Sequence, residues 1–121
     1  MIDYDYMTEF HQFQGDFKRG QTSPDEVGEL IMRMAGHYAK YNIEYAGKLQ
    51  TFSAVMAELI NSVDIQSGKG MTASKAEILG DATTESAAFQ IAKIHVNNIQ
   101  EYINSLKSLQ KSLMVEYHQM T

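Results

Sequence analysis

The chain has 121 residues, enough for one domain with a modest core, and carries 10 Lys and Arg against 15 Asp and Glu. The formal charge of -5 argues against a basic nucleic-acid surface over the whole chain but permits a local patch. The absence of cysteine excludes disulfides, thiol nucleophiles and cysteine-built metal sites. No apolar run approaches the roughly 20 residues of a membrane span, and the N-terminus does not resemble a signal peptide. We therefore expect a cytoplasmic protein without membrane partners.

The first predicted element is a short helix over residues 3–19. Its aromatic side chains recur at steps of four, three and four residues, which places them on one stripe of a helix. They are Tyr6, Phe10, Phe13 and Phe17. A break is expected at Gly20.

A long second helix has the clearest start signal in the chain. Ser23 is followed by a proline and, three residues on, by Glu26, which is the spacing of a capping box. From Val27 to Val63 apolar residues recur at a mean spacing of 3.6 residues, the period of a straight helix. We predict one helix over residues 24–63, about 60 Å long.

The connection after this helix is predicted to be an irregular elbow over residues 64–83, because glycines lie there among polar neighbours. Within the elbow, Ser74 and Glu77 have capping-box spacing, which predicts a short helical turn that Gly80 closes.

A second long helix is predicted over residues 84–118. Thr83 or Thr84 is expected to cap its start. Its apolar stripe from Phe89 to Tyr117 has a mean spacing of 3.5 residues, close to the coiled-coil period.

These elements predict an all-α fold, a single domain over residues 1–121. Two long helices joined by a connector normally fold back as a long antiparallel helical hairpin, here with a short N-terminal aromatic helix. Apolar residues also lie off the main stripes, so each long helix has more apolar surface than one neighbour covers. We therefore expect a homo-oligomer. The predicted interface residues are Tyr38, Tyr41, Tyr45, Phe52, Leu106 and Leu113.

Catalytic, metal and cofactor chemistry find little support in the sequence. No histidine follows a glutamate at the three-residue spacing that helical metal sites use. The mid-helix acids Glu44, Glu58 and Glu101 stand among polar neighbours, as on a solvated face. We expect no enzyme, no metal site and no cofactor.

Two pairs of lysines are candidates for contact with a nucleic-acid backbone. Lys69 and Lys75 flank the start of the elbow helix, whose unpaired N–H groups favour anions. Lys107 and Lys111 stand one turn apart on the last helix. Seven acidic and only three basic residues lie in residues 1–35, so the acidity is concentrated away from both pairs. A flexible connector and a solvated helix face are the alternatives.

The tyrosine run from Tyr38 to Tyr45, with Lys40 and Lys48 nearby, also suits stacking on single-stranded bases. The same spacing continues the apolar stripe, however, which favours buried or interface aromatics.

The stretch GKGMTASKAEILGDAT at residues 68–83 and the segment IQEYINSLKSLQ at residues 99–110 resemble small helical proteins of phages and prophages. The shared features are a Ser-Lys-Ala-Glu turn and a late Ile-x-x-Leu-Lys-x-Leu-Gln segment. The layout is also similar to phage recombination mediators, oligomeric helical proteins that help a recombinase displace single-strand-binding protein. This resemblance implies contacts with DNA or with a recombination protein. The positions to test would be Lys69, Lys75, Lys107 and Lys111.

Taken together, these features predict a non-enzymatic oligomeric helical protein of phage or mobile-element origin. It would assist DNA recombination or replication by binding a protein partner or single-stranded nucleic acid. The alternative is a structural or adaptor hairpin with protein partners only.

Overall fold

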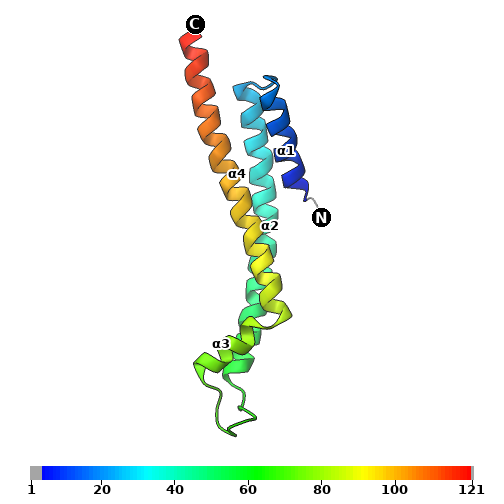
Figure 1. The fold of residues 1–121 in the computed structure, drawn as a ribbon, viewed down its shortest axis with the longest axis vertical. Helices are drawn as coiled ribbons and strands as arrows, with labels where there is room; N and C mark the ends of the chain where they lie inside the picture. The colour runs from blue at the N-terminus through cyan, green and yellow to red at the C-terminus, as the bar shows by residue number, and fades with distance from the viewer. Residues whose placement is uncertain (1–3, 121) are drawn as a thin grey trace. The chain divides into compact units, whose positions relative to one another are not determined.

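The computed structural model describes residues 4–120, which contain four helices and no strand. The helices are α1 (Asp5–Lys18), α2 (Pro24–Ile60), α3 (Ala73–Asp81) and α4 (Thr84–Met120), shown in Figure 1. The long helices α2 and α4 pack against each other, which confirms the predicted all-α helical hairpin. Asp3, the predicted first residue of the short helix, lies outside the described residues.

The chain divides into two compact units, each of which takes part of α2 and part of α4. Unit 1 comprises the described residues up to Lys40 and those from Asn97 onward. Unit 2 comprises Tyr41–Val96, which includes the elbow and α3.

Both ends of α2 have a local cause. The hydroxyl of Ser23 accepts a hydrogen bond from the Glu26 amide at 3.4 Å, which confirms Ser23 as the capping residue. The helix ends at Ile60, earlier than the predicted Val63. At this end the Ser62 hydroxyl donates to the Leu59 carbonyl at 2.7 Å, and Val63 instead forms a β-bridge with the elbow loop.

Threonines rather than serine cap the next two helices. The predicted Ser74 cap of α3 is wrong, because the Thr72 side chain accepts from the Lys75 amide at 3.2 Å and Ser74 lies inside the helix. Thr72 has the extended backbone that an N-cap requires. For α4 the structure selects Thr83, whose hydroxyl accepts from the Ser86 amide at 3.1 Å.

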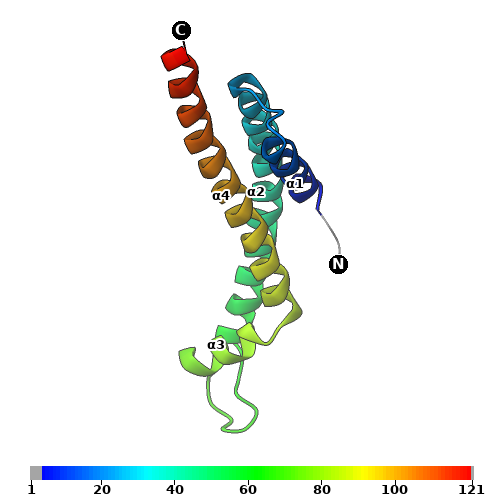
Figure 2. The same ribbon diagram turned by 45° about the horizontal axis from the view of Figure 1, so that its top comes forward.

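Unit 1 is a three-helix assembly of α1, the first part of α2 and the last part of α4, visible in Figure 1 and Figure 2. The predicted aromatic stripe of α1 supplies its centre. Tyr6 is fully buried, and the ring of Phe10 stacks on Tyr102 with centroids 3.9 Å apart. The largest fully buried side chains of this unit are Tyr6, Val27, Leu30, Met34, Ile99 and Leu106.

Charged groups also join α1 to α2 in unit 1. The two ring nitrogens of His37 lie 3.5 Å from an oxygen of Asp5 and 3.3 Å from an oxygen of Glu9. Glu9 also pairs with Arg33 at 3.4 Å. Although His37 is mostly buried, the side chains of Asp5, Glu9 and Arg33 are 35–54% exposed, so these contacts contribute little to stability and mainly fix the position of α1.

In unit 2 aromatic rings join α2 to α4. Phe89 stacks on Tyr45 and on Phe52, each with ring centroids 5.5 Å apart. Elsewhere in this unit α3 packs on α2 at Gly80, which is buried against the side chain of Met56. A Cβ atom at position 80 would overlap the sulfur of Met56, so an alanine there would require the end of the Met56 side chain to move.

Replacing Gly80 with alanine should therefore stabilise the protein by less than the roughly 0.5–1 kcal/mol that alanine normally gains over glycine in a helix, because the end of Met56 must move. Gly47→Ala is the matched control. Gly47 is an exposed glycine of α2 with open space where a methyl group would stand, and its replacement should stabilise the helix by roughly 0.5–1 kcal/mol. Thermal unfolding followed by circular dichroism measures both, and equal effects would contradict the proposed packing.

Candidate protein-binding surfaces

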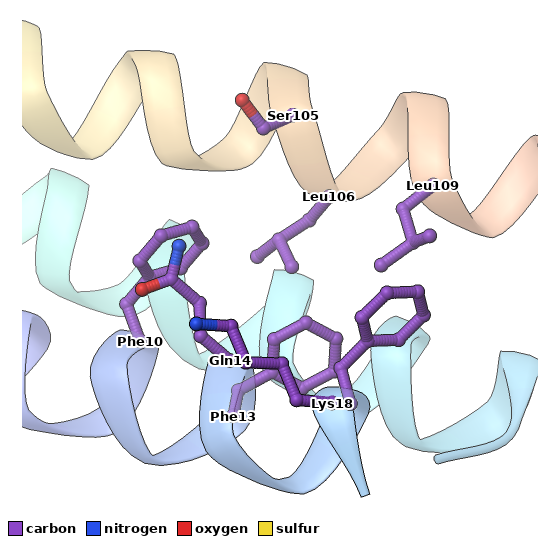
Figure 3. A pocket seen from close by; sticks show the side chains of 8 residues that line it. Phe10, Phe13, Gln14, Lys18, Ser105, Leu106 and Leu109 are labelled. Carbon is purple, nitrogen blue, oxygen red and sulfur yellow. The ribbon is translucent and has the colours of Figure 1, made fainter. Parts of the chain in front are cut away.

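The first surface is an apolar groove between α1 and α4 in unit 1, which we call the aromatic groove. Its hollow has a volume of about 210 Å³. Figure 3 shows Phe10 and Phe13 of α1 facing Leu106 and Leu109 of α4. The lining residues are Phe10, Phe13, Gln14, Phe17, Lys18, Ser105, Leu106 and Leu109.

Burial decreases along the aromatic stripe of α1. Tyr6 and Phe10 are buried and Phe13 is half-buried, but Phe17 is 41% exposed. The rings of Phe13 and Phe17 stack on each other with centroids 6.2 Å apart, so they form a preformed aromatic wall. Lys18 is the only charged residue among those that line this groove, which makes the groove apolar with a basic rim.

The second surface lies at the elbow in unit 2. Backbone hydrogen bonds hold residues 62–71 as a narrow loop: the Asp64 amide donates to the Lys69 carbonyl at 2.7 Å, and the Met71 amide donates to the Ser62 carbonyl at 3.0 Å. Gly68 has φ +69°, a conformation that favours glycine. The elbow is therefore an ordered loop instead of a loose connector.

A salt bridge fastens this loop to α3. The ammonium group of Lys75 lies 2.9 Å and 2.8 Å from the two carboxylate oxygens of Asp64 and 3.1 Å from the Gln66 side-chain oxygen. The hydrogen bond from Lys75, together with one from the Gln66 amide, holds the pKa of Asp64 below its usual value. Asp64 is accordingly a carboxylate that keeps Lys75 in a structural role.

A hollow of about 390 Å³ at this elbow is lined by both apolar and polar residues. Ile65, at the loop, is 98% exposed, and Val63 beside it is also exposed. Burying an isoleucine side chain contributes about 1.5–3 kcal/mol, so a partner that covers Ile65 would gain up to this free energy. The elbow surface is lined by Leu59, Ser62, Val63, Asp64, Ile65, Gln66, Met71, Lys75 and Leu79.

The four predicted DNA-contacting lysines fall into two groups. Lys69 and Lys75 belong to unit 2, and Lys107 and Lys111 belong to unit 1. Lys69, Lys107 and Lys111 are exposed. Lys75 is partly buried and engaged by Asp64, which weakens its candidacy as a phosphate contact.

The predicted interface residues need correction at two positions. Tyr41 and Leu106 are 7% and 1% exposed and pack mainly within their own units, so little of either side chain is available to a second copy. The Tyr41 ring lies beside His95 with centroids 5.6 Å apart. The others are half-buried, and two of them, Tyr45 and Phe52, are covered in part by the Phe89 ring. Tyr38 and Leu113 keep some surface exposed.

The acids Glu44, Glu58 and Glu101 are exposed, as on a solvated face. Among residues 4–120 no three metal-ligating side chains come together. In the same range, no helix has both the length and the apolar character needed to cross a bilayer.

No protein-family model matches this chain, and neither do curated proteins or solved structures. The two surfaces are therefore the features from which a function is inferred.

The role of Lys75 is testable. Lys75→Met keeps the aliphatic stem but leaves the Asp64 carboxylate without its ammonium partner, so the loop should open. We expect faster amide hydrogen exchange at Asp64 and Gly68, whose amides bond within the loop. Lys69→Met, which removes an exposed charge from the same loop, should leave these rates unchanged. Equal rates in the two variants would show that the salt bridge does not hold the loop.

The stability of unit 2 should depend on pH through His95, which is 8% exposed. Burial lowers its pKa below the usual 6.5, although Glu44 acts in the opposite direction. Below about pH 6.5 the unfolded chain thus binds more protons than the folded chain, and stability falls as the solution is acidified. In His95→Gln the melting temperature should fall less between about pH 7.5 and about pH 5.5 than it does in the control variant His11→Gln, which replaces an exposed histidine. An unchanged slope would contradict this assignment.

Proposed function

We propose that this protein is a non-enzymatic helical hairpin that works by binding another protein at its elbow surface. The observation that carries the proposal is Ile65, 98% exposed on a loop that hydrogen bonds and the Asp64–Lys75 pair hold in place. A surface that is ordered before binding loses little conformational entropy when a partner docks.

The chemistry of the elbow surface describes the partner. Apolar side chains of the partner would fill the hollow between the loop and α3, where Val63, Ile65 and Leu79 are exposed. The exposed ammonium group of Lys69 on the same loop suits a carboxylate at the edge of the contact. We infer that the partner presents a short apolar segment with at least one acidic residue.

Replication or recombination is the proposed setting. It is supported by the resemblance of residues 68–83 and 99–110 to phage-encoded helical proteins. The elbow loop lies partly within the first of these stretches, so the resembling segment and the proposed binding surface overlap.

Binding of single-stranded DNA is the second candidate. It is favoured by Lys107 and Lys111, which are exposed on neighbouring turns of α4. Neither lysine lies on the elbow, so the two candidates are separable by substitution.

The test is a selection from a displayed library of random peptides on the immobilised protein. We expect enriched peptides that combine apolar and acidic residues. Ile65→Asp should weaken the selected peptides at least roughly tenfold, because a charge replaces the exposed apolar contact. Asn61→Asp adds the same charge at an exposed position just after α2 and is the matched control.

Peptides that bind wild type and Ile65→Asp equally would contradict the elbow proposal. Fluorescence anisotropy with an oligothymidine measures the second candidate in parallel. Affinity that falls steeply with salt and is lost in Lys107→Glu/Lys111→Glu would favour DNA binding.

A further inference from the structure

The C-terminal end of α4 extends past its neighbours in unit 1. The Gln110 side chain donates to the carbonyl of Pro24, the first residue of α2, at 3.3 Å. The rest of α4 therefore lies beyond the start of α2, as Figure 1 and Figure 2 both show. We call residues 111–120 the helix end.

The helix end is apolar on more than one side. Met114, Val115 and Tyr117 are exposed, with Tyr117 at 52%, and Leu113 is half-buried. At about 100° per residue these apolar side chains span roughly 200° of the helix, wider than the roughly 100° stripe that one neighbouring helix covers. The described part of unit 1 supplies no further helix to cover this end.

The helix end follows the aromatic groove along α4. A residue advances by about 100° around a helix, so Leu113, Glu116 and Tyr117 lie on the same side of α4 as the groove residue Leu109. The lining of the groove on α4 ends at Leu109, so the apolar side of the helix end begins one turn further along the same side of the helix.

We propose that a second copy of the chain covers this surface. The two α4 ends would pack antiparallel about a two-fold axis near Leu113, so that each helix end enters the aromatic groove of the other copy. With this register, Tyr117 of one copy lies level with Leu109 of the other and fills the space beside Phe17. Each groove is completed by a residue that its own chain does not supply, as an isologous interface requires.

The charges of the two surfaces favour this register. The groove has Lys18 at its rim, and the side of the helix end that would enter the groove carries Glu116. Both side chains are exposed in the single chain. In the antiparallel pair each Lys18 faces Glu116 of the other copy, which gives two identical ion pairs. A parallel arrangement would bring the two Glu116 side chains together instead.

This contact uses unit 1 and is independent of the elbow surface. Light scattering on the full chain at micromolar concentration should give about twice the mass of 13.7 kDa. Lys18→Glu and Glu116→Lys should each weaken the dimer by roughly tenfold, because each creates two like-charge contacts. The double variant Lys18→Glu/Glu116→Lys restores the pairs and should recover the wild-type dissociation constant.

Lys93→Glu is the control for net charge, since it makes the same change on an exposed part of α4 in unit 2. Tyr117→Asp should give a folded monomer, because the helix end is exposed in the single chain.

A wild-type monomer, or a dimer that the double variant does not restore, would overturn the proposed interface. Neither result bears on the elbow, whose peptide binding is measured with the Tyr117→Asp variant.

Discussion

Two helices of 37 residues each carry most of the apolar surface of this chain, and one neighbouring helix covers only one side of each. In unit 1 the additional cover comes from α1, through the buried rings of Tyr6 and Phe10. That cover becomes incomplete toward the end of α1, where Phe17 is partly exposed, and it is missing where α4 passes the start of α2. The groove and the helix end are both apolar surfaces that the helices of unit 1 leave uncovered. The proposed second copy would cover both, because its helix end would fill the groove and its groove would receive the helix end.

The helices could be predicted from the sequence because of the periodicity of their apolar residues and the chemistry of their capping residues. A 3.6-residue stripe without an internal proline leaves few alternatives to one long helix, and Ser23 caps it as its spacing to Glu26 predicts. The ends of the helices were harder to predict, because they depend on how the elbow loop folds. Helix α2 stops at Ile60 since Val63 pairs with Gly70 across the elbow, and periodicity contains no information about such a pairing. The predicted capping residue of α3, Ser74, was wrong for the same reason, and Thr72 caps this helix instead.

The candidate surfaces were only partly predictable. Lys75 was predicted to contact a nucleic-acid backbone. Its actual partner, Asp64, is eleven positions away in the sequence and comes close to it only when the loop has folded. Ile65 was not among the predicted site residues, although a large apolar residue in a polar, glycine-containing stretch is a signal that could have pointed to it. The aromatic groove could not be predicted from the sequence, because it depends on which faces of α1 and α4 are turned toward each other. The resemblance to phage recombination mediators stays a prediction.

Cross-linking through a single introduced cysteine tests directly whether a second copy of the chain covers the exposed apolar surface of unit 1. The natural chain has no cysteine, so Leu113→Cys places one thiol near the proposed two-fold axis. Mild oxidation should convert most of this variant to a disulfide-linked dimer, since two such residues would face each other there. Val115→Cys lies about 200° around the helix from position 113 and should cross-link much less. Equal cross-linking at the two positions, or none at position 113, would contradict the account.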